Sequence, residues 1–251
     1  MFRALFTLSA AALMVALAPA AGRAADEPKD IIAKAIKAHG GEAVLAKQKA
    51  AQLKTKGKIN VPGAGEAEFS QEASFMLPDK FKDAMELKVA GQTINVLTLV
   101  NGNKVTLEVN GKDAGDADKV KDAIKDVGHV MEVARLVGLK DKGYELSIIG
   151  EDKVEGKKVV GVRVSKKDHK DVSLYFDKAT GLIAKLEYRA TDPATGNEIA
   201  EERLPSDYAK NKDGVPVAKK VVIKRDGKVF LEAEVLEIKY FDKLDDSEFK
   251  K

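Results

Sequence analysis

Apolar and polar residues alternate one by one along several segments of the chain, and this two-residue period constrains the fold more than any other feature. In LKTKGKINV, residues 53–61, the odd positions carry Leu, Thr, Gly, Ile and Val, while lysines and an asparagine occupy the even positions. The alternation recurs over 81–89 and 105–109. Successive side chains of a strand point to opposite faces, so this pattern predicts an antiparallel sheet with one buried and one solvated face.

Turn signals separate the alternating segments. VPGAG at 61–65, NGN at 101–103 and NG at 110–111 place glycine or asparagine where tight hairpins need them. Further strands are expected at Tyr144–Ile149, Lys158–Ser165, Asp171–Phe176, Leu182–Thr191, Glu198–Leu204, Val215–Lys224 and Val229–Phe241. With about ten or eleven strands joined mostly by hairpins, the sequence predicts a mainly β, antiparallel meander. No composition change marks a boundary, so residues 25–251 are expected to form one domain.

Two nearly identical loops, DKATG at Asp177–Gly181 and DPATG at Asp192–Gly196, bracket one of these strands. The first is close to the phosphorylated DKTGT loop of cation-pumping ATPases, but its residue order differs. Aspartate accepts backbone N–H groups two residues ahead and glycine takes the left-handed conformation, so both loops are interpreted as hairpin turns. The strand between them, Leu182–Thr191, spans about 33 Å when extended, which suits a curved sheet or a barrel wall.

The segment before the first strand has helical character. DEPKDIIAKAIKAHGG carries acids and a proline in its first turn and ends in two glycines, Gly40 and Gly41. Its apolar stripe comprises Ile32, Ala35, Ile36 and His39. A second, short helix is expected from Glu42 to about Ala51.

A longer amphipathic helix is predicted from about Asp116 to Val137, between the two groups of strands. Its apolar residues recur at spacings of three and four: Val120, Ile124, Val127, Met131 and Ala134. Because a one-sided helix has to bury its apolar stripe, we expect it to cover the apolar face of the sheet.

The first 24 residues are interpreted as a secretory signal peptide. Arg3 precedes an apolar run, Ala4–Leu17, which is short for a membrane span and is followed by small-residue cleavage patterns ending at Ala20 and Ala24. The chain has no cysteine, and therefore neither disulfides nor a lipid-anchor cysteine. The mature protein is expected to be periplasmic or secreted, without a transmembrane segment.

Loss of the signal peptide also changes the charge balance. Removal of Arg3 and Arg23 leaves 41 basic against 40 acidic residues, a net charge of +1. A nearly neutral chain gives no reason to expect nucleic acid or an anionic membrane surface as a partner.

Several segments, taken in order, resemble a known family. These are the N-terminal helix ending in AHGG, LYFDKATGLIAKLEYR at 174–189, DYAKNKDGVPVAKKVVIKRDGK at 207–228 and the terminal DDSEF. They are similar to the periplasmic lipoprotein-sorting superfamily, the LolA-type carriers with their relatives LolB and LppX. The resemblance implies an open, or half, antiparallel β-barrel whose concave apolar face is covered by an N-terminal and a central helix. It also implies a role in outer membrane biogenesis, because members shield lipoprotein acyl chains or other lipids in aqueous space.

The expected function is therefore an extracytoplasmic binding or carrier protein for a hydrophobic ligand, without covalent chemistry. The candidate lining of the site comprises Leu87, Val89, Leu107, Val120, Ile124, Val127, Met131, Leu174 and Phe176. Periodicity does not separate a ligand cavity from a dry core between sheet and helix, and both interpretations stay open.

The sequence also bears on two other function classes. An enzyme is disfavoured, because His39, His129 and His169 stand in unrelated contexts and HExxH, GxSxG, P-loop and Cys/His patterns are absent from the sequence. No catalytic residue, metal or cofactor is therefore assigned. The alternative is an envelope structural or protein-interaction module that uses an exposed strand edge. In either case we expect a monomer.

Overall fold

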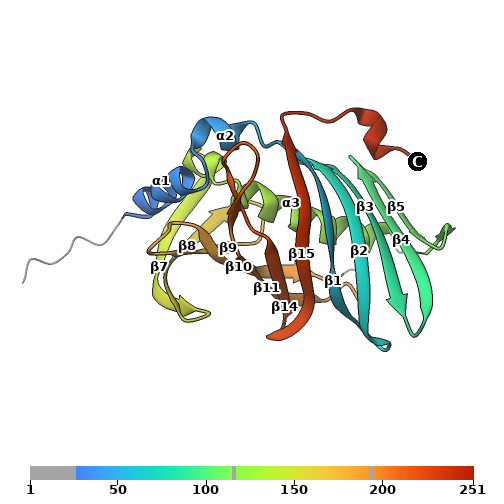
Figure 1. The fold of residues 1–251 in the computed structure, drawn as a ribbon. Coiled ribbons are helices and arrows are strands. Elements are labelled where there is room, and N and C mark those ends of the chain that lie inside the picture. The colour runs from blue at the N-terminus through green and yellow to red at the C-terminus, as the bar shows by residue number, and fades with distance from the viewer. Residues whose placement is uncertain (1–26, 115–116, 193–194) are drawn as a thin grey trace, which may run out of the picture.

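The computed structural model describes residues 27–114, 117–192 and 195–251 (Figure 1), so the predicted signal peptide lies outside the described residues. The helices are α1 Pro28–Ala38, α2 Glu42–Ala46 and α3 Ala117–Ala134, with 3-10 helices η1 Val137–Lys140 and η2 Asp246–Phe249. The strands are β1 Ala50–Val61, β2 Gly65–Met76, β3 Lys80–Val89, β4 Gln92–Asn101, β5 Lys104–Val109, β6 Lys112–Asp113, β7 Tyr144–Val154, β8 Lys157–Lys166, β9 Val172–Asp177, β10 Ile183–Thr191, β11 Glu198–Ser206, β12 Ala209–Lys210, β13 Pro216–Val217, β14 Lys220–Arg225 and β15 Lys228–Phe241.

Thirteen of the described strands form one antiparallel sheet in the order β6-β5-β4-β3-β2-β1-β15-β14-β11-β10-β9-β8-β7, while β12 and β13 pair separately. The strand β15 joins two meanders, because it pairs with β1 on one side and with β14 on the other. The order ends at β6 and β7, which do not pair with each other. The predicted open antiparallel sheet, not closed into a barrel, is confirmed.

The helix α3 connects the two edge strands of this sheet. β6 ends at Asp113 and β7 begins at Tyr144, at opposite ends of the strand order, so the intervening chain has to cross a face of the sheet. α3 contacts β5 near one edge and β9 and β10 toward the other, and Figure 1 shows it running across the strands. We call the side that carries α3 the helix face and the opposite side the outer face. No described helix combines the length and the apolar character that crossing a membrane requires.

The strand register assigns side chains to these two faces, because directly paired residues share a face. Tyr188 packs in the core beneath the helices, so its side of the sheet is the helix face. Tyr188 pairs with Glu201 of β11, and Glu201 pairs with Arg225 of β14, so both lie on this face. The pairing of β14 with β15 and of β15 with β1 extends the assignment to those two strands. In β1, β2 and β3 the odd-numbered residues therefore lie on the helix face, as do the even-numbered residues of β4. The alternation in 53–61 correctly predicted these two faces.

The main core lies where α1 and α3 pack on β8, β9 and β10. The apolar stripe of α1, including Ile32 and Ala35, is buried there. The two glycines end α1 as predicted: Gly40 and Gly41 have φ of +108° and +91°, and the N–H of Gly41 donates to the carbonyl of Ile36 at 2.9 Å.

Both aspartate loops are hairpin turns, as predicted. Asp177 Oδ1 accepts the backbone N–H groups of Ala179 and Thr180 at 2.8 and 2.9 Å. In the second loop, Asp192 Oδ1 accepts the N–H of Thr195 at 2.9 Å. Glycines with φ of +75° and +77° close the two loops. These aspartates are scaffold residues at the two ends of β10.

Two helix boundaries differ from the prediction. α2 ends at Ala46 instead of near Ala51, because Ala50 and Ala51 are fully buried in β1 between β2 and β15. α3 ends at Ala134, and Leu136 at φ +64° interrupts the helical backbone before η1 begins. Tertiary pairing and a local left-handed residue thus override the helical pattern.

The strand count is higher than the predicted ten or eleven. The sheet also contains three strands that were not predicted from the sequence, namely β2, β4 and the two-residue strand β6. The expected strand at 215–224 is divided, because Pro216–Val217 pairs with Ala209–Lys210 outside the main sheet and β14 begins only at Lys220.

Candidate ligand-binding face

The helix face has a covered part and a part that keeps solvent exposure. Under α1 and α3, side chains of β8 and β9 such as Val162, Val172 and Leu174 are 0% exposed. On the remaining strands, many apolar side chains of the same face are only half-buried: Leu53, Ile59, Met85, Leu87, Val89, Ile94, Val96, Leu107, Val109, Val221, Ile223, Leu231 and Val235. We call this set the open apolar face. Contiguous apolar exposure of this kind is typical of a binding surface.

The helix α3 supplies a second apolar surface. Val130 and Val133 are buried in the main core, whereas Ile124, Val127 and Met131 are half-buried. Since the latter three recur at helical spacing, they lie on one side of the helix. α3 therefore carries one stripe that anchors it and a neighbouring stripe that remains partly exposed.

On β1 and β2 the outer face is different in chemistry, whereas elsewhere it carries apolar clusters around Phe249 and around Leu204. Its even-numbered lysines and glutamates pair across strands, as in Lys54–Glu72 at 2.5 Å and Lys58–Glu66 at 2.8 Å. An open hollow of about 660 Å³ lies over this face, lined among others by Lys56, Glu68 and Lys220. Charged groups that are already hydrated and paired give an apolar ligand little to bind. The helix face is the better candidate.

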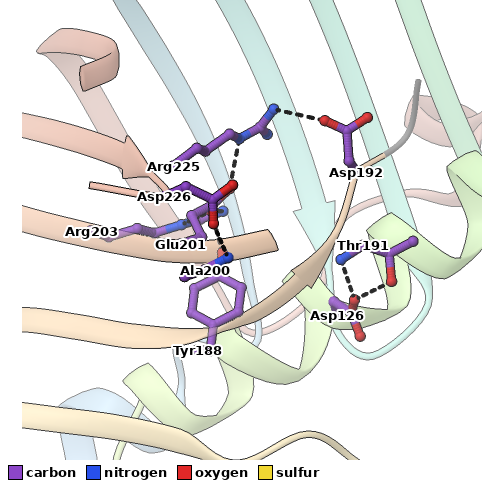
Figure 2. A network of polar contacts seen from close by, with 9 residues as sticks. All are labelled: Asp126, Tyr188, Thr191, Asp192, Ala200, Glu201, Arg203, Arg225 and Asp226. Atoms are coloured by element: carbon purple, nitrogen blue, oxygen red, sulfur yellow. Dashed lines mark hydrogen bonds and ion pairs between the residues drawn. The ribbon is translucent and has the colours of Figure 1, made fainter. Parts of the chain in front are cut away.

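A buried ion network lies on the helix face, where β10, β11 and β14 adjoin (Figure 2). Glu201 is 3% exposed, and its Oε1 accepts from Nε and an Nη of Arg203, both at 3.0 Å, and from the hydroxyl of Tyr188. Its Oε2 accepts from Nε of Arg225 at 3.1 Å, and the Arg225 guanidinium lies 3.6 Å from the ring centroid of Phe230.

The network is electrostatically matched. Burial opposes ionisation of Glu201, but Arg203, the Tyr188 hydroxyl and Arg225 together lower the pKa of this carboxyl. Burial raises the pKa of Tyr188, so the phenol stays neutral. Asp192 lies 4.0 Å from Arg225 and adds a second negative charge. Two carboxylates thus face two guanidiniums, an arrangement that stabilises the junction of the strands.

A second polar contact in Figure 2 holds α3 on the sheet. Asp126 Oδ2 accepts the backbone N–H and the hydroxyl of Thr191, both at 2.9 Å. The same oxygen accepts from Nζ of Lys170, which the figure does not draw, at 3.0 Å. The carboxylate connects the middle of the helix to the end of β10 and to the loop before β9. These bonds fix the distance between α3 and the sheet at one point of the helix.

Comparisons with known proteins agree with this architecture. No family model matches the sequence, and no curated protein matches it. Among solved structures, a DUF1329 family protein from Desulfovibrio piger is 13% identical, with 90% of this chain and 98% of that chain covered at a TM-score of 0.53. A LolA superfamily protein from Nitrosomonas europaea is 10% identical, with 90% and 99% covered at a TM-score of 0.51.

The chain has the LolA-type fold. The predicted resemblance is thereby confirmed at the level of the fold. At identities this low, shared architecture does not carry a ligand from one protein to another, so the site has to be argued from this chain's own residues.

All nine predicted lining residues lie on one side of this LolA-type sheet or on the helix that crosses it. Leu87, Val89 and Leu107 belong to the open apolar face, and Ile124, Val127 and Met131 to the half-buried stripe of α3. Val120, Leu174 and Phe176 are 5%, 0% and 1% exposed, and the latter two belong to the covered core. Contact of any of the nine with a ligand stays a prediction.

Part of this face was not predicted from the sequence. No lining residue was expected on β4, β14 or β15, which contribute Val96, Ile223 and Leu231. The ion network was not predicted either, because Glu201, Arg203 and Arg225 lie on two strands whose pairing is not local. An inward-facing glutamate and arginine two residues apart in EERL was the only available signal.

The histidines occupy structural positions. His39 caps α1, with Nδ1 2.8 Å from the carbonyl of Ala35. His129 of α3 is 5% exposed and stacks on His169 with ring centroids 4.2 Å apart. Within the described ranges, no three His, Cys, Asp or Glu residues are placed to hold a metal ion.

His129 makes the stability of the fold depend on pH. Burial, together with the positive charges of His169 and Lys166, lowers the pKa of His129 from 6.5 to about 4. Below pH 6.5 the unfolded chain therefore takes up a proton that the folded chain resists, and stability is lost as pH falls toward 4. Complete protonation of the unfolded chain would lower the free energy of unfolding by about 3 kcal/mol, because each pKa unit corresponds to about 1.4 kcal/mol. We expect His129→Leu to gain stability relative to the native chain between pH 7 and pH 4.5, as measured by urea unfolding.

The comparison between variant and native chain is essential, because another group acts in the opposite direction. Burial raises the pKa of Asp83 from 3.8 to about 6, so this carboxyl adds stability as pH falls from 6 toward 4. The native protein can thus show a small net change. If the free energies of unfolding of His129→Leu and of the native chain differed by the same amount at pH 7 and at pH 4.5, the lowered pKa of His129 would be contradicted.

Proposed function

We propose that the protein is an extracytoplasmic carrier or binding protein for a hydrophobic ligand, which it holds between the open apolar face and α3. The observation that carries the proposal is the contrast within one face. Its apolar side chains are fully buried beside α1, and those of β2, such as Phe69 and Phe75, are buried as well, but many on β1, β3, β4, β5, β14 and β15 are only half-buried. Further support comes from the LolA-type fold, whose resemblance implies shielding of acyl chains, and from the signal-like sequence at 1–24.

The energetics of such binding are sufficient without any titratable group. Transfer of an acyl chain of about fourteen carbons from water contributes roughly 10 kcal/mol at ~0.8 kcal/mol per CH₂, before the costs of association. We therefore infer binding without covalent chemistry, by a protein that acts as a monomer in the periplasm or outside the cell.

The first experiment asks whether the native protein contains lipid. The mature protein is purified from its own compartment, examined by native mass spectrometry and extracted for lipid. We expect a reproducible mass excess that organic extraction removes and identifies as lipid. A protein that is empty and also excludes fluorescent fatty-acid probes would overturn the carrier proposal.

Met131→Lys is expected to weaken probe binding by at least about tenfold, because it places an ammonium group on the apolar stripe where an alkyl chain would lie. The measurement is a titration of a fluorescent fatty acid against the folded variant. Leu236→Lys is the matched control. Leu236 is 48% exposed and lines a hollow of the outer face with Lys54 and Glu72, so this variant should bind as the native chain does. Equal losses in both variants would contradict the assigned face.

A second candidate, a protein-interaction module, is supported by the edge strand β7. β7 pairs with β8 along one edge, and its other edge pairs with no described strand. The strand carries Ile148 and Ile149, which are 42% and 38% exposed. An apolar edge of this kind can accept a strand from another protein. This candidate takes precedence if the native protein is free of lipid and Ile148→Thr with Ile149→Thr removes an envelope partner from the purified material.

A further inference from the structure

A row of polar side chains crosses the open apolar face over four neighbouring strands. Thr55 of β1 donates through Oγ1 to Oε1 of Gln71 on β2 at 2.8 Å, and Gln71 Nε2 donates to Oδ2 of Asp83 on β3 at 3.0 Å. Asp83 is paired with Thr98 on β4. We call Thr55, Gln71, Asp83 and Thr98 the polar row. These four polar residues follow one another from strand to strand, whereas the residues on either side of them on this face are apolar or glycine.

The residues next to the polar row on the same face are apolar or glycine. The nearest ones along their strands are Leu53, Gly57, Phe69, Ala73, Phe81, Met85, Val96 and Val100. These surroundings remove water from the carboxyl, and burial raises the pKa of Asp83 although the hydrogen bond from Gln71 acts in the opposite direction. An acid here destabilises the empty protein, so its presence calls for a reason beyond packing.

The hydrogen bonds of the row leave one group without a partner. Asp83 Oδ2 is used by Gln71, but Asp83 Oδ1 is buried and has no hydrogen-bond partner among the described residues. If the row served only to fix the strand register, a neutral side chain would do so without this unpaired oxygen. The terminal torsion of an aspartate is broad, so a modest rotation can turn Oδ1 toward a molecule on the face.

We propose that the ligand is a lipid with a hydroxyl group on its alkyl chain, and that Asp83, oriented by Gln71, forms a hydrogen bond with this hydroxyl. The inference rests on the carrier function proposed above. A hydroxyl both donates and accepts, so it satisfies the carboxyl in either protonation state. A plain alkyl chain would leave Asp83 buried and unpaired, which disfavours it relative to the hydroxylated one.

The position of Asp83 fits such a ligand. The helix face of β3 continues past it through Met85, Leu87 and Val89, a length of about 20 Å at ~3.3 Å per residue. This stretch accommodates alkyl chain on one side of the hydroxyl, while Phe81 borders the other. The row would thus fix the depth at which the chain lies.

The test compares stearic acid with a series of hydroxystearic acids that differ in the position of the hydroxyl, by displacement of a fluorescent fatty acid from the whole mature protein. We expect at least one hydroxystearic acid to bind the native protein about tenfold or more tightly than stearic acid. Asp83→Leu should abolish this preference. Glu86→Leu, which removes a carboxylate from the outer face of the same strand, should keep it.

The outcomes separate the two proposals. Equal binding of stearic and all hydroxystearic acids overturns the hydroxyl inference and leaves the carrier function standing. Absence of binding by every fatty acid and by the probe overturns the carrier function as well. If Asp83→Leu does not fold, Asp83→Asn replaces it. This neutral variant should reduce the preference to about threefold or less, since charge-assisted hydrogen bonds are the stronger ones, and an unchanged preference contradicts the role of Asp83.

Discussion

Glu201→Gln is expected to lower the free energy of unfolding by about 3–5 kcal/mol, a large part of the ~5–15 kcal/mol that stabilises an ordinary domain. The substitution keeps the shape of the side chain but removes its charge. Arg203 and Arg225 then lose the carboxylate that accepts three of their N–H groups. Urea unfolding at pH 7 measures the effect as a shift of the midpoint at unchanged slope.

Glu202→Gln provides the matched control for this prediction. Glu202 is the next residue of β11 and therefore lies on the outer face, where it is half-buried. Its change is expected to stay within about 0.5 kcal/mol. A double variant with Arg203→Gln should lose less than the two single variants together, because each single change leaves an unpaired partner. Additive losses, or equal losses at 201 and 202, would show that the network does not stabilise the fold.

Gly57→Ala is expected to destabilise the protein by about 3 kcal/mol or more, because the added methyl group has no room against backbone. A Cβ at Gly57 would lie 1.8 Å from the carbonyl oxygen of Glu232 and 3.0 Å from Cα of Ala233, both on β15. Backbone cannot move aside as a side chain does, so β1 and β15 would have to separate at the centre of the sheet. Thermal and urea unfolding both report the loss.

Gly143→Ala is the control for Gly57→Ala. A Cβ at Gly143 meets nothing within 4 Å, and the residue does not need a left-handed backbone. Its substitution should be neutral or slightly stabilising, by about 0.4–1 kcal/mol. Should Gly57→Ala be as stable as Gly143→Ala, the close approach of β1 and β15 would be wrong.

Much of the local structure was predictable because it depends on near neighbours in the chain. Alternation over 53–61 correctly separated the two faces, and the loops at 177–181 and 192–196 were recognised from turn chemistry that involves only a few residues. Prediction failed where a partner strand decides the conformation. Ala50 and Ala51 belong to a helical pattern locally, yet they form β1 because two strands pair with them.

The candidate site was predictable only in part, for a similar reason. The apolar residues of β3, β5 and α3 follow periodic patterns and were identified from them. Asp83 breaks the alternation of Phe81, Met85, Leu87 and Val89, and this irregularity was the available signal for the polar row. Its meaning depends on Gln71 and Thr55, which only the register brings next to it.

The sequence by itself determined the class of the protein: one-sided strands, an amphipathic helix to cover them, and turns that make the strands antiparallel. Only the tertiary structure decided which parts of the apolar face are dry. β15 pairs with β1 and places the edge strands β6 and β7 at opposite ends of the sheet, so α3, which connects them, has to cross the helix face. The pairing of distant segments is set by the free energy of the whole chain, and no local pattern contains it.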